Sequence, residues 1–181
     1  MDDLSSENFA QLTLGFHESV SLDLDKVVVG GHSFGGMTAI MVSHHDPRVK
    51  ATFGFDPWLW VVVDKIREGN FSLEQPQMHV VTEHFNPICL EWFEFDTVKE
   101  LQRMYENKRR PEQELIVLNE TNHYHQCDAI MMIPLESFVK GGNKIQLNYP
   151  DLLLLNTKAV LQFLDKIGFN NAYQYKTSFS K

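Results

Sequence analysis

The most informative stretch of the chain reads Val28-Val29-Gly30-Gly31-His32-Ser33-Phe34-Gly35-Gly36-Met37-Thr38. It begins with β-branched, uniformly apolar residues, the pattern of a strand that is buried on both faces. Beyond the glycines, apolar residues recur at helical spacing. Gly31, Ser33 and Gly35 place the pattern Gly-x-Ser-x-Gly at the junction. A serine in such a turn adopts a strained backbone conformation that pushes its hydroxyl out of the sheet. The stretch therefore predicts a strand, a sharp turn presenting Ser33, and a helix.

The rest of the chain alternates between strand and helix patterns. Strands are predicted over 26–30, 49–55, 78–82 and 115–118, and helices over 34–45, 95–107 and 151–167. Asp151 is the expected N-cap of the last helix and Gly168 its expected C-cap. Because such alternation favours a parallel sheet, we expect an α/β fold with a mainly parallel sheet and helices on both faces. A length of 181 residues suits a single domain over 1–181.

Composition excludes some classes of partner. Hydrophobic residues make up 43% and charged residues 22%, as in a globular protein. The net charge of −8 argues against nucleic acid, since binding to phosphates rests on cationic contacts. The acidic N-terminus resembles no signal peptide and no apolar run approaches the ~20 residues of a membrane span, so the default expectation is a cytoplasmic chain. Cys89 and Cys127 are expected to be reduced thiols.

The turn at Ser33 predicts nucleophilic chemistry. A serine hydroxyl is a poor nucleophile, so it needs a histidine base and a carboxylate that orients the base. In an α/β-hydrolase fold these follow the serine in the order acid, then histidine. The backbone N–H of Phe34 is expected to be one oxyanion donor, and the helix N-terminus favours the negative charge of a tetrahedral intermediate. The sequence therefore predicts a serine esterase of the α/β-hydrolase kind.

Two carboxylates are candidates for the acid, and the pattern alone leaves the choice open. Asp56 directly follows the predicted strand 49–55, and Glu83 directly follows the strand 78–82. Two histidines after the strand 115–118 are candidates for the base, His123 and His125. The His-x-His spacing also fits a metal site, but no third ligand stands at a telling distance, so we expect no metal.

The sequence resembles the plasma and type II intracellular platelet-activating-factor acetylhydrolases. The resemblance is most specific over Asp25 to Gly36 and continues to about Phe169. Further similar segments are Phe55-Asp56-Pro57-Trp58, Thr82-Glu83-His84-Phe85, Ile116 to His123 and Leu161-Gln162-Phe163-Leu164. Glu120 and Thr121 depart from the family, which usually has glycine before its histidine motif.

The resemblance implies the roles that the pattern left open. Asp56 matches the family's acid, which makes Glu83 the alternative. His123 matches the family's base without a gap, whereas His125 requires an insertion of two residues and is the alternative. The implied activity is calcium-independent hydrolysis of the short or oxidised sn-2 acyl ester of platelet-activating-factor-like phospholipids, without a cofactor. Trp58 and Trp60, which flank the acid, are expected either to pack in the core or to line the substrate pocket.

One part of an α/β-hydrolase has no counterpart here. The second oxyanion donor comes from a loop after an early strand, yet only about 25 residues precede the strand that leads to Ser33. We therefore expect a partial fold that lacks the early strands, and a partner chain could supply them. The alternative to an esterase is then a non-catalytic half-hydrolase that serves as a structural subunit of a larger assembly.

Overall fold

A four-stranded parallel sheet forms the centre of the molecule. The computed structural model describes residues 5–6, 8–110, 112–128 and 149–169. Within them the strands lie in the order β1-β2-β3-β4, and each pair of neighbours is parallel. Their bounds are β1 (Val27–His32), β2 (Val49–Phe55), β3 (Gln77–Thr82) and β4 (Gln113–Leu118). The α/β prediction is confirmed, and every predicted strand exists.

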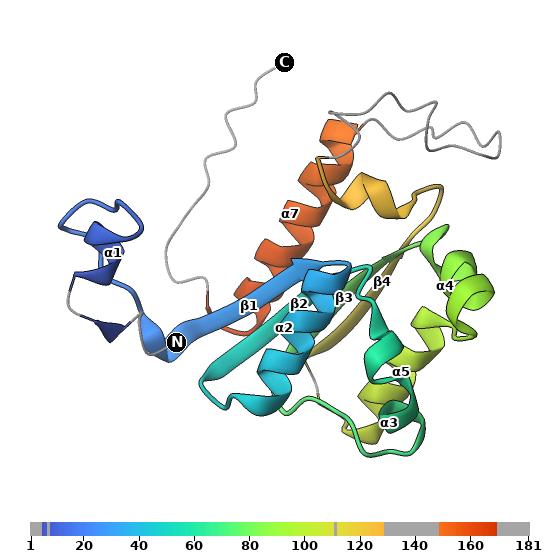
Figure 1. The fold of residues 1–181 in the computed structure, drawn as a ribbon. Coiled ribbons are helices and arrows are strands. Elements are labelled where there is room, and N and C mark those ends of the chain that lie inside the picture. The colour runs from blue at the N-terminus through green and yellow to red at the C-terminus, as the bar shows by residue number, and fades with distance from the viewer. Residues whose placement is uncertain (1–4, 7, 111, 129–148, 170–181) are drawn as a thin grey trace.

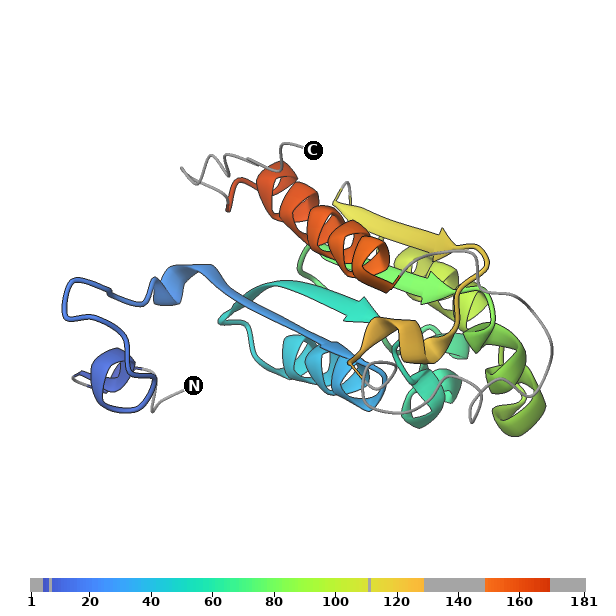
Figure 2. The same cartoon turned by 90° about the horizontal axis from the view of Figure 1, so that it is seen from above.

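Helices cover both faces of this sheet, as the sequence predicted (Figure 1). One face carries α2 (Phe34–His45), α3 (Val63–Arg67), α4 (Phe85–Phe93) and α5 (Thr97–Asn107). The other face carries α7 (Tyr149–Lys166), as the view from above shows (Figure 2). Each face has its own apolar core, one around Ile40, Leu101 and Met104 and the other around Phe163 and Met78. Residues of β3 face both cores, which explains why that strand is buried along its whole length.

The ends of α7 test the predicted caps. The helix begins at Tyr149, so Asp151 lies in its first turn and the prediction that it is the N-cap is wrong. Gly168 has a φ of 75° and ends the helix as predicted. Its N–H donates to the Asp165 carbonyl, and the Phe169 N–H donates to the Leu164 carbonyl. These two bonds form a Schellman motif, which requires a residue in the left-handed region at Gly168.

The sequence did not predict α3 and α4. α4 contains Pro87, which usually marks a helix end, but here it stands in the first turn, where the missing N–H has no helical partner to lose. α3 is only five residues long and is too short to show a period. Both helices lie on the face that carries α2 and contribute to its core.

The residues before β1 form no strand in the part that the structure describes, 5–6 and 8–26. They contain α1 (Phe9–Leu12) and the 3₁₀ helix η2 (Leu24–Lys26), and α1 lies apart from the sheet in both views (Figures 1 and 2). β1 is therefore the edge of the described sheet. None of the described helices combines the length and apolar character that a membrane span requires.

Candidate active site

Ser33 sits in a sharp turn between β1 and α2. Its φ of 59° and ψ of −122° are a conformation that residues other than glycine rarely adopt. The Ser33 N–H donates to the Phe55 carbonyl at 2.9 Å, and the Trp58 N–H donates to the Ser33 carbonyl at 3.1 Å. Such strain persists only where the surroundings impose it. Here β2 and the residues after it hold the turn, and the Ser33 side chain is half-buried rather than enclosed.

The two glycines of the pattern have different roles. A Cβ on Gly31 would lie 2.5 Å from the Gly35 carbonyl carbon, so the strand and the helix can approach only because Gly31 lacks a side chain. A Cβ on Gly35 would have no atom within 4 Å among the described residues. The close approach of β1 and α2 at this turn therefore depends on Gly31. Gly35 supplies the helix backbone that lies against Gly31.

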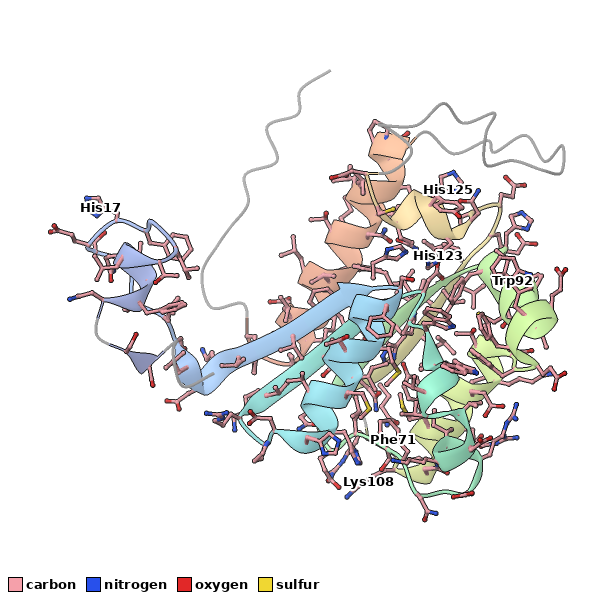
Figure 3. The ribbon with its side chains drawn as sticks, viewed as in Figure 1. His17, Phe71, Trp92, Lys108, His123 and His125 are labelled. Atoms are coloured by element: carbon pink, nitrogen blue, oxygen red, sulfur yellow. The ribbon has the colours of Figure 1, made fainter. Side chains whose placement is uncertain are left out.

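His123 brings an imidazole to the Ser33 hydroxyl. It opens the 3₁₀ helix η4 (His123–Gln126), which follows β4 and is capped by the Asn122 side chain. Its Nε2 lies 2.9 Å from Ser33 Oγ, within hydrogen-bonding distance. Figure 3 shows His123 at the carboxyl edge of the sheet. Ser33 and His123 are 90 positions apart in the sequence. They come together because both follow strands of one parallel sheet, whose carboxyl ends lie at the same edge.

Asp56 lies behind this imidazole and is fully buried. It directly follows β2 and has a φ of 44°. Its Oδ2 lies 3.2 Å from His123 Nδ1 and accepts a hydrogen bond from the Thr82 hydroxyl at 2.7 Å. Its Oδ1 accepts from the Thr82 N–H at 2.6 Å. Thr82, which the sequence analysis did not single out, therefore fixes the carboxylate from the end of the next strand.

The two alternative candidates lie elsewhere. Glu83 is exposed, and its Oε2 accepts from the Glu120 N–H at 2.6 Å. His125 is 2% exposed, and its Nδ1 accepts from the Asn122 N–H at 2.8 Å, which closes the cap of η4. Burial lowers the pKa of His125. Of the candidate bases and acids, His123 and Asp56 are the pair in line with Ser33.

The predicted oxyanion donor stands at the start of a helix. Phe34 is the first residue of α2, so its N–H is among the first four that have no partner within the helix. The positive end of the helix dipole points to the same place. This position suits a donor to a negative oxygen that forms on an acyl group attached to Ser33.

Two aromatic rings that the sequence did not reveal pack against His123. The His32 ring lies 4.3 Å from it, centroid to centroid, at an angle of 38°. The Phe85 ring lies 4.5 Å from it and is nearly parallel, at 12°. Burial, followed by the charge of His123, lowers the pKa of His32 to about 4. No feature of the sequence pattern indicates that the His32 ring packs against an imidazole from a distant loop.

A row of aromatic side chains begins beside Ser33, where Phe34 is 62% exposed, and extends to α4. Phe34 lies 6.1 Å from Trp58, which lies 5.2 Å from Phe93 on α4. Phe93 in turn lies 6.1 Å from Trp60 and 6.4 Å from Trp92. Trp92, labelled in Figure 3, is 69% exposed and Trp60 is 56% exposed, whereas Trp58 packs partly against the core. The two predicted pocket residues thus differ, since Trp58 is largely packed and Trp60 is open.

One group of described residues could hold a metal ion. His32, Asp56 and His123 each offer a ligand atom, and these atoms lie within 4.8 Å of one another. The Asp56 carboxylate, however, already accepts two hydrogen bonds from Thr82 and lies beside His123. A metal ion would have to replace the contact between Asp56 and His123, so the arrangement suits transfer of a proton better than metal binding.

Known proteins resemble this chain. Three relatives are each named platelet-activating factor acetylhydrolase. The protein from Cavia porcellus is 27% identical over 108 residues, which is 60% of this chain and 22% of the relative. The protein from Bos taurus is 34% identical over 65 residues, 36% of this chain and 14% of the relative. The protein from Canis lupus familiaris is 27% identical over 109 residues, 60% of this chain and 22% of the relative.

The matched region spans less than a quarter of the length of each of these relatives. A family model described as platelet-activating factor acetylhydrolase, isoform II, matches residues 8–179, nearly the whole chain. The resemblance seen in the sequence is therefore confirmed, and the chain belongs to the family of platelet-activating factor acetylhydrolases, isoform II.

Proposed function

We propose that this chain carries the catalytic centre of a serine esterase, with Ser33 as nucleophile, His123 as base and Asp56 as the acid that orients the base. The observation that carries the proposal is the unbroken line of contacts from Ser33 Oγ to His123 Nε2 at 2.9 Å and from His123 Nδ1 to Asp56 Oδ2 at 3.2 Å. A line of hydroxyl, imidazole and carboxylate is the arrangement that activates a serine. The strained turn at Ser33 supports the same assignment.

The first half of the reaction forms an acyl-enzyme. Ser33 Oγ attacks the carbonyl carbon of the ester while its proton passes to His123 Nε2. Asp56 holds the His123 ring so that Nδ1 keeps its proton, and it stabilises the imidazolium that forms. The N–H of Phe34 donates to the oxyanion. When the tetrahedral intermediate collapses, His123 returns its proton to the departing alkoxide, and the alcohol leaves.

The second half releases the acid. His123, neutral again, removes a proton from water, and the resulting hydroxide attacks the acyl carbonyl. Collapse of the second tetrahedral intermediate breaks the bond to Ser33 Oγ, which regains the proton from His123. The products are a carboxylic acid and free enzyme. The chemistry requires no calcium and no cofactor, because an imidazole performs each transfer.

The family and the surroundings of Ser33 support a proposal for the substrate class. We propose phospholipids with a short or oxidised sn-2 acyl ester, since the relatives are named platelet-activating factor acetylhydrolases. The aromatic row from Phe34 through Trp58 to Trp60 and Trp92 offers an apolar wall for such a lipid. The sn-2 preference also requires a pocket that ends close to Ser33.

The test is hydrolysis of two glycerophosphocholines that differ only in the sn-2 acyl group, acetyl or palmitoyl, in the presence of a calcium chelator. We expect faster turnover of the acetyl compound, with loss of turnover in Ser33→Ala and no loss in Ser72→Ala, a serine at the opposite end of the sheet. Equal rates for both lipids would contradict the substrate assignment. A folded wild-type chain that cleaves neither lipid, and whose Ser33 reacts with no acylating probe, would instead favour the structural half-hydrolase.

A further inference from the structure

The rings of His32 and Phe85 enclose the imidazole of His123. The His32 centroid lies 4.3 Å from the His123 centroid with the rings tilted by 38°, and the Phe85 centroid lies 4.5 Å away with the rings stacked at 12°. No contact between the His32 and Phe85 rings themselves is found among the described residues, so the two rings approach His123 from different sides. They come from separate elements, since His32 ends β1 beside the nucleophile and Phe85 opens α4. The base is thus held between the nucleophile strand and a helix on the core side.

Both rings are at least partly buried. Phe85 is 6% exposed and belongs to the core that also contains Met37 and Leu59. His32 is half-buried, and its ring Nε2 is buried without a hydrogen-bond partner among the described residues. Because the His32 ring at the end of β1 packs against the His123 ring at the start of η4, this contact links the two elements.

The chemistry gives these contacts a purpose beyond packing. Accepting the serine proton makes His123 a cation, and the negative faces of aromatic rings stabilise a cation that lies over them. Phe85, nearly parallel at 12°, presents its face to the imidazolium. His32 must remain neutral to do the same, and burial together with repulsion by His123 lowers its pKa to about 4. A neutral ring therefore faces the base throughout the pH range in which an imidazole can act as one.

We propose that His32 and Phe85 are positioning residues that form an aromatic clamp, which confines the His123 ring to the plane between Ser33 and Asp56 and stabilises its cation. The proposal rests on the role given to His123 in the proposed function. The clamp adds to that function two side chains that hold His123 in the orientation it needs to accept the Ser33 proton. Asp56 fixes the rotation of the His123 ring within the plane of that ring. The aromatic clamp fixes the tilt of this plane relative to Ser33 and Asp56.

The test compares His32→Ala and Phe85→Leu with the rescue variant His32→Phe in the hydrolysis of a short-chain ester. A cation–π contact of ordinary strength corresponds to a change of about 2- to 30-fold in rate. We expect each of the first two variants to lower kcat by that factor with little change in KM. His32→Phe restores an aromatic face and should recover most of the lost kcat.

Phe71→Leu is the matched control. Phe71 is 2% exposed and stacks on His44 with centroids 4.4 Å apart, so the control removes the same kind of ring from a histidine at the other end of α2. It should destabilise the fold about as much as Phe85→Leu and leave kcat within about twofold. All variants are compared at a temperature at which each remains folded by near-ultraviolet circular dichroism.

A second readout does not depend on turnover. The carbon-bound ring protons of His123 lie under two aromatic faces, so their NMR signals should shift when Phe85→Leu or His32→Ala removes a ring. Unshifted signals, or kcat in His32→Ala within twofold of wild type, would overturn the clamp. So would His32→Phe that is as slow as His32→Ala. If His123→Ala abolishes reaction at Ser33 while the clamp variants react normally, only the clamp fails. If His123→Ala reacts normally, the proposed function fails as well.

Discussion

The two ends of the sheet are built from similar residues but differ in backbone strain and in buried charge. At the carboxyl end, Ser33 and Asp56 directly follow β1 and β2, and Glu120 stands two residues after β4. These three residues have positive φ values of 59°, 44° and 57°. At the amino end, the turn between α2 and β2 is tied by an ordinary pair of Asp46 and Arg48 in solvent. Each end has a histidine stacked on a phenylalanine, and Figure 3 shows Phe71 and His123 at opposite ends.

The difference in backbone strain and buried charge indicates which end of the sheet carries features that cost stability. A buried carboxylate and a strained serine both cost stability, and such features persist where function requires them. In the stacked pair His44 and Phe71, the imidazole Nδ1 lies 3.0 Å from the Ser72 carbonyl, whereas in the stacked pair His123 and Phe85 the imidazole contacts both Ser33 and Asp56. Substitutions at the carboxyl end should therefore change turnover, and those at the amino end only stability.

The largest expected effect comes from Asp56→Asn. An amide can offer its N–H group to His123 and then favours the wrong tautomer, so we expect kcat to fall by about 10³- to 10⁴-fold. The measurement is steady-state hydrolysis of a short-chain ester. Gln75→Ala, which removes a hydrogen bond to the Ser43 carbonyl at the amino end, is the control and should leave kcat unchanged. A loss below tenfold in Asp56→Asn would contradict the role of the carboxylate.

The next effect separates the two glycines of the turn. Gly31→Ala forces a methyl group to 2.5 Å from the Gly35 backbone, and we expect a loss of about 1–3 kcal/mol or more in the free energy of unfolding. Gly35→Ala adds a methyl group in open space within a helix, so the free energy should change by less than about 1 kcal/mol. Urea denaturation of both variants measures the difference. Equal losses would show that the crowding at Gly31 is absent.

A smaller effect concerns pH. The pKa of His32 is about 4 in the folded chain and about 6.5 in the unfolded chain. Between these values the unfolded chain binds a proton that the folded chain does not, so the free energy of unfolding falls as the pH is lowered from about 6.5 to 4. In His32→Phe this contribution is absent, and the decline over that window should be shallower. The free energy of unfolding is measured by urea denaturation at each pH. If it falls equally steeply in the variant and in the wild type, the contribution of His32 is contradicted.

The smallest effect is expected at the alternative acid. Glu83→Gln removes an exposed carboxylate that accepts from the Glu120 N–H, and a neutral oxygen can accept the same bond. We expect kcat within about twofold of wild type and a change in stability below about 1 kcal/mol. A large drop in kcat would transfer the role of the acid from Asp56 to Glu83.

How much of this was visible in the sequence depended on distance along the chain. The turn at Ser33 and helix α2 were predicted with the correct bounds because their signals lie within a dozen residues. Asp56 and His123 were predicted as partners of Ser33 by resemblance to a family, because spacing alone could not choose between Asp56 and Glu83. The geometry now brings Asp56 to the imidazole, although the catalytic roles themselves stay predictions.

The rest of the site could not be predicted because it depends on contacts between distant segments. Thr82 binds the Asp56 carboxylate only since β2 and β3 are neighbours in register. His32 and Phe85 are far from His123 in the sequence, and no local pattern indicates that either ring packs against it. Asp151 was wrongly predicted as an N-cap because the helix extends two residues further, with Pro150 in its first turn.

The central claim is that Ser33 is activated by His123, and covalent labelling tests it most directly. The folded chain is treated with a fluorophosphonate, which reacts with activated serines, and the labelled peptide is identified by mass spectrometry. We expect one phosphonate on Ser33 in the wild-type chain and in Ser72→Ala, and none on Ser33 in His123→Ala. Labelling of Ser33 at the same rate in His123→Ala, or a label on another serine that Ser33→Ala does not remove, would contradict it.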